Sequence, residues 1–214
     1  MAFPTTGILD DFNRADENPL ANGNWSNPIR SGNAGMRLVS LRAAGHTASA
    51  DSTSYWSAAT YGPDSEAWVK IPTLMEDNGG GNVTVFVRIT TPGASLNCYM
   101  AIARRGTGNW QLYRCVSGSF VSLGTAARSM VAGDGIGLEA IGTAIKVYRF
   151  TAGAWNQTPI LSVSDGNVTG SGNVGLGSFS GSSPSVARMT PFGGGTVVAG
   201  IVPILMRQYR ARNH

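Results

Sequence analysis

Hydrophobic and polar residues alternate over short runs along much of the chain. The clearest runs lie between residues 132 and 179: Ile136–Ile141, Ala144–Phe150, Ile160–Val163 and Val174–Phe179. A period of two is typical of strands that bury one face, and the breaks between the runs contain Gly, Asp or Asn, which favour turns. Gly142–Thr143 lies between two of the runs and suits a tight hairpin. This part of the chain is therefore predicted to form antiparallel strands.

The same alternation predicts further strands earlier in the chain, at Met36–Arg42, Glu66–Ile71 and Val83–Thr91. In the last of these, one face should carry Val83, Val85, Val87 and Ile89, and the other Phe86 and Arg88. No segment shows a sustained apolar period of 3.6 residues with caps. We therefore expect a helix content below about a tenth, against about a third in an average globular protein.

Two cysteines flank the segment CYMAIARRGTGNWQLYRC, which predicts a hairpin. If the turn is centred on Gly106–Thr107, Cys98 lies directly opposite Cys115. Opposed residues have Cβ atoms close enough for a disulfide. The sequence leaves two interpretations open, a disulfide or two buried thiols that pack as small apolar residues, and we prefer the second.

The composition favours one all-β domain. A length of 214 residues fits a single sandwich, and 42% hydrophobic residues are enough for a sizeable core. The 29 glycines and a charged fraction of 13%, against the usual quarter, indicate many turns and a weakly charged surface. The net charge of +4 owes much to Arg207, Arg210 and Arg212 near the end of the chain. No basic patch with interleaved aromatic residues stands out elsewhere, so nucleic-acid binding is not expected.

The order of the pieces carries a family resemblance. The hairpin pattern of residues 132–179 ends in GNVGLGSF, and the chain opens with the segment Ile8–Arg14, followed by Asp16, Leu20 and Trp25. Over about residues 7–195 this resembles concanavalin A-like (laminin-G-like) jelly rolls. The resemblance implies a two-sheet antiparallel sandwich, with Ser185–Thr190 as its closing strand beside the first. Such sandwiches include lectins, glycosidases and structural modules, so the resemblance indicates a fold rather than an activity.

The acidic residues argue against catalysis. Glycosidases of this fold place two carboxylates on one strand, as E-x-D-x-x-E or E-x-D-x-E, and the chain contains neither spacing. Asp64 and Glu66 are two residues apart but stand at a strand entrance after a proline, and Glu139 is a lone acid expected to face solvent or to pair with an arginine. The two histidines, His46 and His214, lie in no nucleophile motif and in no zinc-site pattern. We therefore expect no enzymatic activity.

Calcium is the metal that the resemblance allows, since concanavalin A-like sandwiches often bind it through Asp, Asn and carbonyl oxygens. The candidate ligands are Asp165, Asn167 and Asn173 in SDGNVTGSGN, or Asp77 and Asn78 before three glycines. The spacing matches no complete calcium loop, and turns require the same residue types. The preferred interpretation is turn chemistry without a cofactor.

Sugar binding needs exposed aromatic side chains beside amides and carboxylates. The candidates are Tyr55, Trp56, Tyr61, Trp110 and Trp155. Aromatic residues near strand ends are also the ordinary anchors of a sandwich core, so both roles stay open.

The chain should end in a separate segment. Gly193–Gly195 is predicted to end the domain at residue 195, and residues 196–214 form a tail that is first apolar and then basic. Its apolar residues are Val197, Val198, Ile201, Val202, Ile204, Leu205 and Met206, and its basic ones are Arg207, Arg210 and Arg212. The tail is too short to span a membrane. Docking onto a neighbouring subunit is preferred over a last strand of its own domain or contact with a membrane surface.

These expectations combine into one functional hypothesis. The N-terminus has neither a basic region nor an apolar stretch typical of a secretion signal. A lectin-like sandwich without such a signal can still work outside cells if it is released by lysis, as bacteriophage particles are. We expect a non-enzymatic virion protein that decorates a bacteriophage capsid or tail. Its expected partners are other virion proteins and copies of itself, and a trimer is the first oligomeric state expected. The alternatives are a carbohydrate-binding module of an adsorption apparatus, which binds surface glycans, and a divergent glycoside hydrolase.

Overall fold

The computed structural model describes residues 2–74, 81–105, 108–180 and 188–198, and their regular structure is β throughout. One sheet, here called the terminal sheet because it holds the first and last strands, has the order β1 (Ile8–Asp10), β16 (Phe192–Thr196), β6 (Ser65–Lys70), β11 (Gly135–Ile141), β12 (Ala144–Thr151) and β13 (Ala154–Trp155), and β14 (Leu161–Ser164) also pairs with β12. The ladders between these strands are antiparallel.

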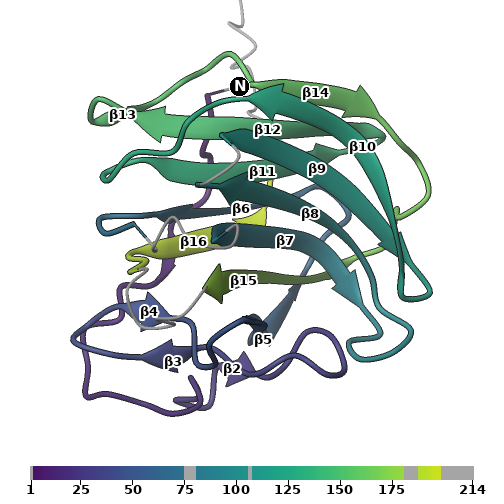
Figure 1. Cartoon of the computed structure of the whole chain (residues 1–214). Helices are drawn as coiled ribbons and strands as arrows, with labels where there is room; N and C mark the ends of the chain where they lie inside the picture. The colour runs from purple at the N-terminus through teal and green to yellow at the C-terminus, as the bar shows by residue number, and fades with distance from the viewer. Residues whose placement is uncertain (1, 75–80, 106–107, 181–187, 199–214) are drawn as a thin grey trace, which may run out of the picture.

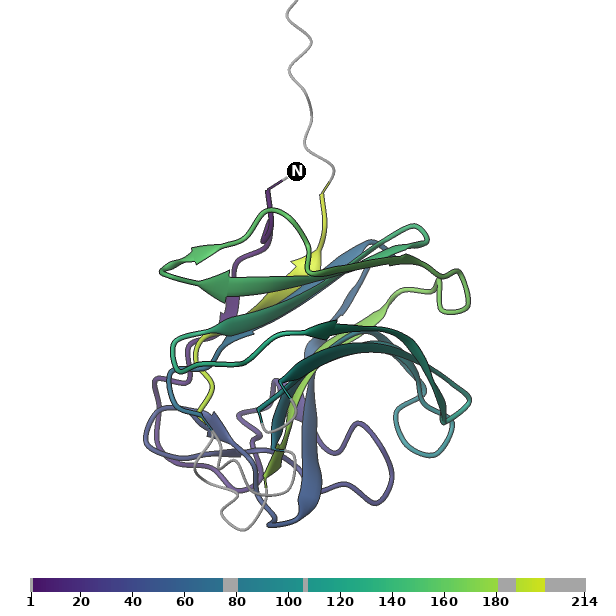
Figure 2. The ribbon, with the colours of Figure 1, turned by 45° about the horizontal axis from the view of Figure 1, so that its top comes forward.

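The second sheet has the order β10 (Ser119–Ala127), β9 (Asn109–Val116), β8 (Asn97–Arg104), β7 (Asn82–Thr90), β15 (Gly172–Ser180), β5 (Ala50–Tyr61) and β2 (Trp25–Ser26). It too is antiparallel. Figure 1 shows it facing the terminal sheet, and Figure 2 shows that it bends with its concave side turned away from that sheet. We call it the curved sheet. A short hairpin, β3 (Arg37–Leu38) with β4 (Ala43–Ala44), lies at one end. The predicted jelly-roll sandwich is confirmed.

The core lies between the two sheets, and the period-two pattern explains it. On β6, Ala67 and Val69 point into the core, whereas Glu66 and Trp68 between them point outward. On β11, Ile136, Leu138 and Ala140 are fully buried in the same core. The predicted hairpin at Gly142–Thr143 is also present, because Ile141 pairs with Ala144 and Gly142 has φ = 54°.

The predicted register of the cysteine hairpin is confirmed. Cys98 is the cross-strand partner of Cys115, and Ala103 pairs with Trp110 near the turn. Both cysteines are free thiols with no exposed surface, and they pack on the outer face of the curved sheet. The Sγ of Cys115 donates to the carbonyl of Leu96 at 3.3 Å.

We expect these thiols to react with Ellman's reagent much more slowly in the folded protein than in denaturant. The thiolate is the reactive form, and burial raises the pKa of Cys98 well above its ordinary value. Absorbance at the released thionitrobenzoate band measures both rates. A fast reaction of both thiols in the native protein would contradict the burial described here.

The faces predicted for the strand Val83–Thr91 are wrong at its C-terminal end. Val83, Val85 and Val87 lie in the core as expected, but Ile89 packs with the outer cluster and Arg88 turns inward, where its side chain is 1% exposed. The register of β7 against β8 shifts between Val87 and Thr90, and Arg88 has φ = 53°. A β-bulge of this kind exchanges the two faces of a strand from that point on.

The closing strand is also different from the prediction. The strand beside β1 is β16, and Gly193–Gly195 lies inside it rather than ending the domain. Of the predicted strand Ser185–Thr190, residues 185–187 lie outside the described residues, and Arg188 and Met189 form isolated bridges to Thr73 and Ala43. A Cβ atom on Gly193 would lie 2.2 Å from the ring of Trp68, so this position can only be glycine while the ring stays in place. The sandwich extends past residue 195, because Thr196 Oγ1 accepts the Gly62 N–H at 2.9 Å and the Val197 N–H donates to Asp64.

Candidate functional site

A pocket opens on the concave face of the curved sheet. It holds about 200 Å³, and its lining residues are Ile29, Arg30, Asn33, Asp51, Thr53, Asn82, Thr84, Phe86, Leu96, Met100, Ile102, Arg104, Tyr113, Phe120 and Ser178. They come from β5, β7, β8, β9, β10 and β15, from the segment that follows β2 and, for Leu96, from the loop before β8. We call it the concave pocket.

The alternation of the strands explains which residues reach this pocket. On β7, Val83 and Val85 fill the core, so Asn82, Thr84 and Phe86 face the other way. On β15 two successive outward positions, Gly175 and Gly177, are glycines, and a Cβ atom on Gly177 would lie 3.0 Å from the side chain of Thr53 and 3.3 Å from the ring of Phe86. Because β15 carries no outward side chain there, the neighbouring side chains approach its backbone and form the floor.

The floor is apolar and partly aromatic, and the rim is polar. Phe86, Met100 and Phe120 belong to or pack against a cluster on the outer face of the sheet. Asn33 lies at the rim, and its side-chain amide donates weakly to Thr53 at 3.4 Å. An apolar floor with a few polar groups around it is the usual composition of a small-molecule site.

Three charged residues line the concave pocket. The guanidinium of Arg30 lies 5.0 Å from the ring centre of Phe120, and Arg104 donates from Nε to Gln111 at 2.8 Å. Burial raises the pKa of Asp51 above its ordinary value, and the charges of Arg30 and Arg104 oppose this rise. Both arginines therefore act on the same carboxylate without being bonded to it.

The predicted sugar-binding aromatic residues do not come together. Trp56 and Trp110 are core residues, 9% and 0% exposed, because they occupy inward positions of β5 and β9. Tyr61 packs against the same core. Trp155 lies on the outer face of the terminal sheet, with its ring 5.0 Å from that of Phe3. Tyr55 alone packs against the outer cluster of the curved sheet.

The aromatic residues that do line the concave pocket are not among the predicted sugar-binding residues. Tyr113 shares its face of β9 with Cys115, and Phe120 is paired with Cys115 across β9 and β10. The register of the cysteine hairpin could have identified them, because residues two positions along a strand from an outward-facing cysteine also face outward.

The calcium candidates Asp165, Asn167 and Asn173 do not form a cation site. Asp165 accepts from Tyr99 Oη at 2.7 Å and from the Arg114 guanidinium at 2.5 Å, and Asn167 also donates to it. The hydrogen bonds of Tyr99, Asn167 and Arg114 hold the pKa of Asp165 at about 2 although burial acts to raise it. Asn173 lies elsewhere and donates to the carbonyls of Trp56 and Ala59. Donors thus occupy the places that a cation would need.

No other metal site replaces this one in the part of the chain that the structure describes, where no three His, Cys, Asp or Glu side chains gather. The remaining candidates, Asp77 and Asn78, lie outside the described residues.

Two carboxylates lie opposite each other on the terminal sheet, at Glu66 and Glu139. Both are buried, which corrects the expectation that Glu139 faces solvent or pairs with an arginine. Glu139 accepts from Lys146 at 3.1 Å and from the hydroxyl of Tyr148 at 3.2 Å. Glu66 Oε1 accepts from the backbone N–H groups of residues 5 and 6, each at 2.6 Å. Glu66 thus fastens the N-terminal segment to the sheet, Glu139 binds two side chains of β12, and neither acid lines the concave pocket.

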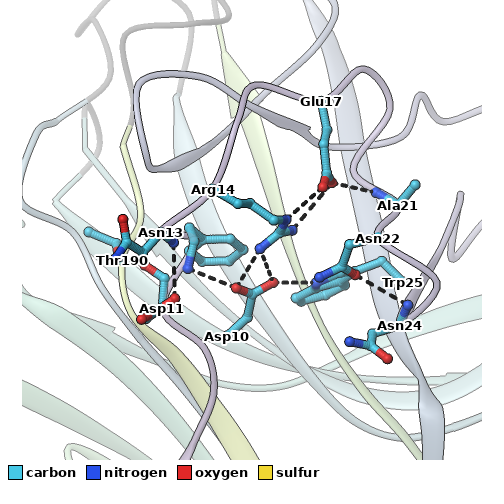
Figure 3. Close-up of polar contacts among 11 residues, drawn as sticks. Asp10, Asp11, Asn13, Arg14, Glu17, Ala21, Asn22, Asn24, Trp25 and Thr190 are labelled. Atoms are coloured by element: carbon cyan, nitrogen blue, oxygen red, sulfur yellow. Dashed lines mark hydrogen bonds and ion pairs between the residues drawn. The ribbon is translucent and has the colours of Figure 1, made fainter.

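The acids of the opening segment are structural as well (Figure 3). Asp10 is buried and accepts from Trp25 Nε1 at 2.7 Å, from Arg14 at 2.7 and 2.9 Å and from the Phe12 N–H at 2.7 Å. Arg14 also binds Glu17 at 2.6 Å. The oxygens of Asp10 are saturated by donors, so this motif joins the first strand to the following loop and offers no free group for chemistry.

Comparisons with known proteins identify the fold. No family model matches the chain, and no curated protein matches it in sequence. Among solved structures, a carbohydrate-binding module, CBM66, from Bacillus subtilis is 15% identical with a TM-score of 0.57, covering 81% of this chain and 93% of that one. The exoplasmic/lumenal domain of VIP36, bound to Ca²⁺ and Man3GlcNAc, is 9% identical with a TM-score of 0.62 and coverages of 88% and 90%.

A third similar structure is a Bacillus subtilis protein of unknown function with a galectin-like fold, which is 14% identical with a TM-score of 0.59 and coverages of 80% and 94%. These likenesses show a lectin-like jelly roll over most of the chain. In the described part of the chain, no helix has the length and hydropathy needed to cross a membrane.

Proposed function

We propose that this protein binds carbohydrate in the concave pocket of the curved sheet. The observation that carries the proposal is the composition of that pocket, where Phe86, Tyr113 and Phe120 provide apolar surface beside Asp51 and polar amides. A sugar ring has an apolar face and a rim of hydroxyl groups, so it needs both kinds of surface at once. The likeness to a carbohydrate-binding module and to a mannose-oligosaccharide-bound lectin domain supports this function.

Binding without hydrolysis is the better-supported form of this function. Asp51 is the one carboxylate among the described residues that line the concave pocket. Glycosidases of the usual type need two carboxyl groups on either side of the scissile bond. The opposed pair Glu66 and Glu139 lies on the other sheet, where the N-terminal segment covers it. We therefore propose a binding protein rather than a glycoside hydrolase.

The VIP36 domain in the comparison is bound to Ca²⁺. The described residues of this chain do not fit such a site, because Arg114 and Tyr99 already occupy the oxygens of Asp165. We propose that glycan binding here persists in the presence of a chelator.

The place of the protein in a virion, and its assembly through the C-terminal segment, stay predictions. Of the tail residues, Val197 and Val198 alone lie within the described chain. Val197 is 6% exposed on its own domain, and Val198 is 71% exposed. The others, Ile201, Val202, Ile204, Leu205, Met206, Arg207, Arg210 and Arg212, lie outside the described residues.

A glycan array followed by calorimetry tests the proposed function. We expect Tyr113→Ala and Asp51→Ala each to weaken binding of the best glycan about tenfold or more, which corresponds to about 1.4 kcal/mol. The first change removes a ring from the pocket, and the second removes a hydroxyl acceptor whose loss leaves the fold intact. Val121→Ala is the matched control, because Val121 is 43% exposed on β10 but does not line the pocket.

The control should bind as the unaltered protein does. Absence of binding to every glycan, or an equal loss in Val121→Ala, would contradict the concave pocket as a sugar site.

A further inference from the structure

In the described chain, three half-buried arginines outside the concave pocket have close carboxylate partners, whereas Arg30 and Arg104 of the pocket, like Arg37, Arg42 and Arg188, do not. Arg14, Arg114 and Arg149 each have a carboxylate oxygen at 2.7 Å or less. Among the described residues, neither Arg30 nor Arg104 has a carboxylate within ion-pair distance. The pocket therefore holds two guanidinium groups that no carboxylate of the described residues contacts.

Both guanidinium groups are positioned by neighbours rather than left to move freely. The ring of Phe120 lies beneath Arg30 at 5.0 Å, an arrangement that holds a cation over an aromatic face. Gln111 on the adjacent strand accepts from Nε of Arg104 at 2.8 Å. A held guanidinium loses less side-chain entropy when it binds, and its planar donors match the oxygens of a carboxylate or a sulfate.

The charge of the pocket favours an anion. Among the described residues, its charged lining consists of Arg30, Arg104 and Asp51, which together carry one net positive charge when all three are ionised. Asp51 feels the field of both arginines, so the three groups surround one space. A ligand with one negative charge would bring this space to neutrality, and its hydroxyl groups could donate to Asp51.

We infer that the concave pocket selects acidic saccharides, with the carboxylate or sulfate of the sugar bound by Arg30 and Arg104. This inference rests on the proposed function, because it names the class of glycan that the same site takes. It goes beyond the fold likeness, because the glycan bound to the similar VIP36 domain is Man3GlcNAc, which carries no charge.

Matched pairs of glycans test the inference. The carboxylate pair is oligogalacturonate and its methyl ester, and the sulfate pair is a carrageenan oligosaccharide and the same oligosaccharide after chemical desulfation. We expect at least one acidic member to bind about tenfold or more tightly than its neutral partner, and this preference to shrink as salt rises. Which pair shows the preference distinguishes a carboxylate from a sulfate ligand.

Arginine variants connect the preference to the pocket. Arg30→Gln and Arg104→Gln should each reduce the preference for the acidic member while thermal unfolding stays unchanged. Arg42→Gln is the matched control, because Arg42 lies outside the pocket and its side chain makes one hydrogen bond to the described residues, to Thr73 at 3.4 Å. If the neutral members bind as tightly as the acidic ones, the inference fails and sugar binding stands. If no glycan binds at all, the proposed function fails with it.

Discussion

Replacing Arg88 with methionine is expected to lower the free energy of unfolding by about 3–5 kcal/mol, because three carbonyls lose their hydrogen-bond donor at once. Arg88 is 1% exposed, and its guanidinium donates to the carbonyls of Pro63 at 2.5 Å, Val168 at 2.7 Å and Gly142 at 2.8 Å. These carbonyls belong to three separate loops at one end of the sandwich. Methionine fills the volume but leaves all three acceptors unpaired, and each such loss costs about 1–3 kcal/mol.

Urea denaturation followed by tryptophan fluorescence measures this effect. Arg88→Lys should fall between the two proteins, because an ammonium group keeps the charge but lacks the planar fork that reaches three directions. Arg42→Met is the control and should stay within about 0.5 kcal/mol of the unaltered protein. A loss below about 1 kcal/mol in Arg88→Met would mean that the three loops are held by other contacts.

The second large effect is expected at the closing strand, where Gly193→Ala should lower the free energy of unfolding by about 1–3 kcal/mol, the usual cost of overpacking. The new Cβ would lie 2.2 Å from Trp68 Cζ2 and 2.7 Å from the carbonyl of Gly7. One clash is with a side chain and the other with the backbone, so Trp68→Leu should recover part of the loss and not all of it. A double-mutant cycle from urea denaturation gives this coupling.

Gly170→Ala is the matched control for the cycle. No atom lies within 4 Å of the position that a Cβ would take on Gly170, and its backbone is not in the left-handed region. This variant should be neutral or slightly stabilising, because alanine restricts the unfolded chain more than glycine does. Equal losses in Gly193→Ala and Gly170→Ala would show that crowding at Trp68 is not the cause.

The strands were predictable from the sequence wherever apolar residues face the core and polar residues face outward in strict alternation. The period of two placed Ile136, Leu138 and Ala140 in the core, and the hairpin register followed from the turn between Cys98 and Cys115. The bulge after Val87 was not predictable, because the apolar and polar residues of Val83–Thr91 continue to alternate past the point where the bulge inserts its extra residue. Arg88 thus appeared as an outward residue although its burial depends on carbonyls distant in sequence.

The closing strand and the candidate site were hidden for a related reason. Three consecutive glycines usually mark a flexible break, but in β16 each has its own cause: the ring of Trp68 at Gly193, the Glu66 carbonyl at Gly194 and a φ of 147° at Gly195. The concave pocket takes Arg30, Asp51, Asn82, Arg104 and Tyr113 from distant parts of the chain. No local spacing connects them, so their proximity needed the folded sheet. Tyr113 and Trp110 are three residues apart, so the alternation places them on opposite faces of β9. Trp110 is buried in the core, and Tyr113 lines the concave pocket.

The place of β16 between β1 and β6 has a consequence for how the protein reaches its fold during synthesis. Ile8 pairs with Gly193, and Phe192 to Thr196 pair with β6. Two ladders of the terminal sheet therefore cannot form until nearly the last described residues have been synthesised. Until then, β1 has no ladder partner and one edge of β6 stays open, and open edges invite pairing with other chains. Pairing between such distant residues also slows folding. A nascent chain shorter than about 196 residues would therefore be the species most in need of protection from aggregation, however stable the finished domain is.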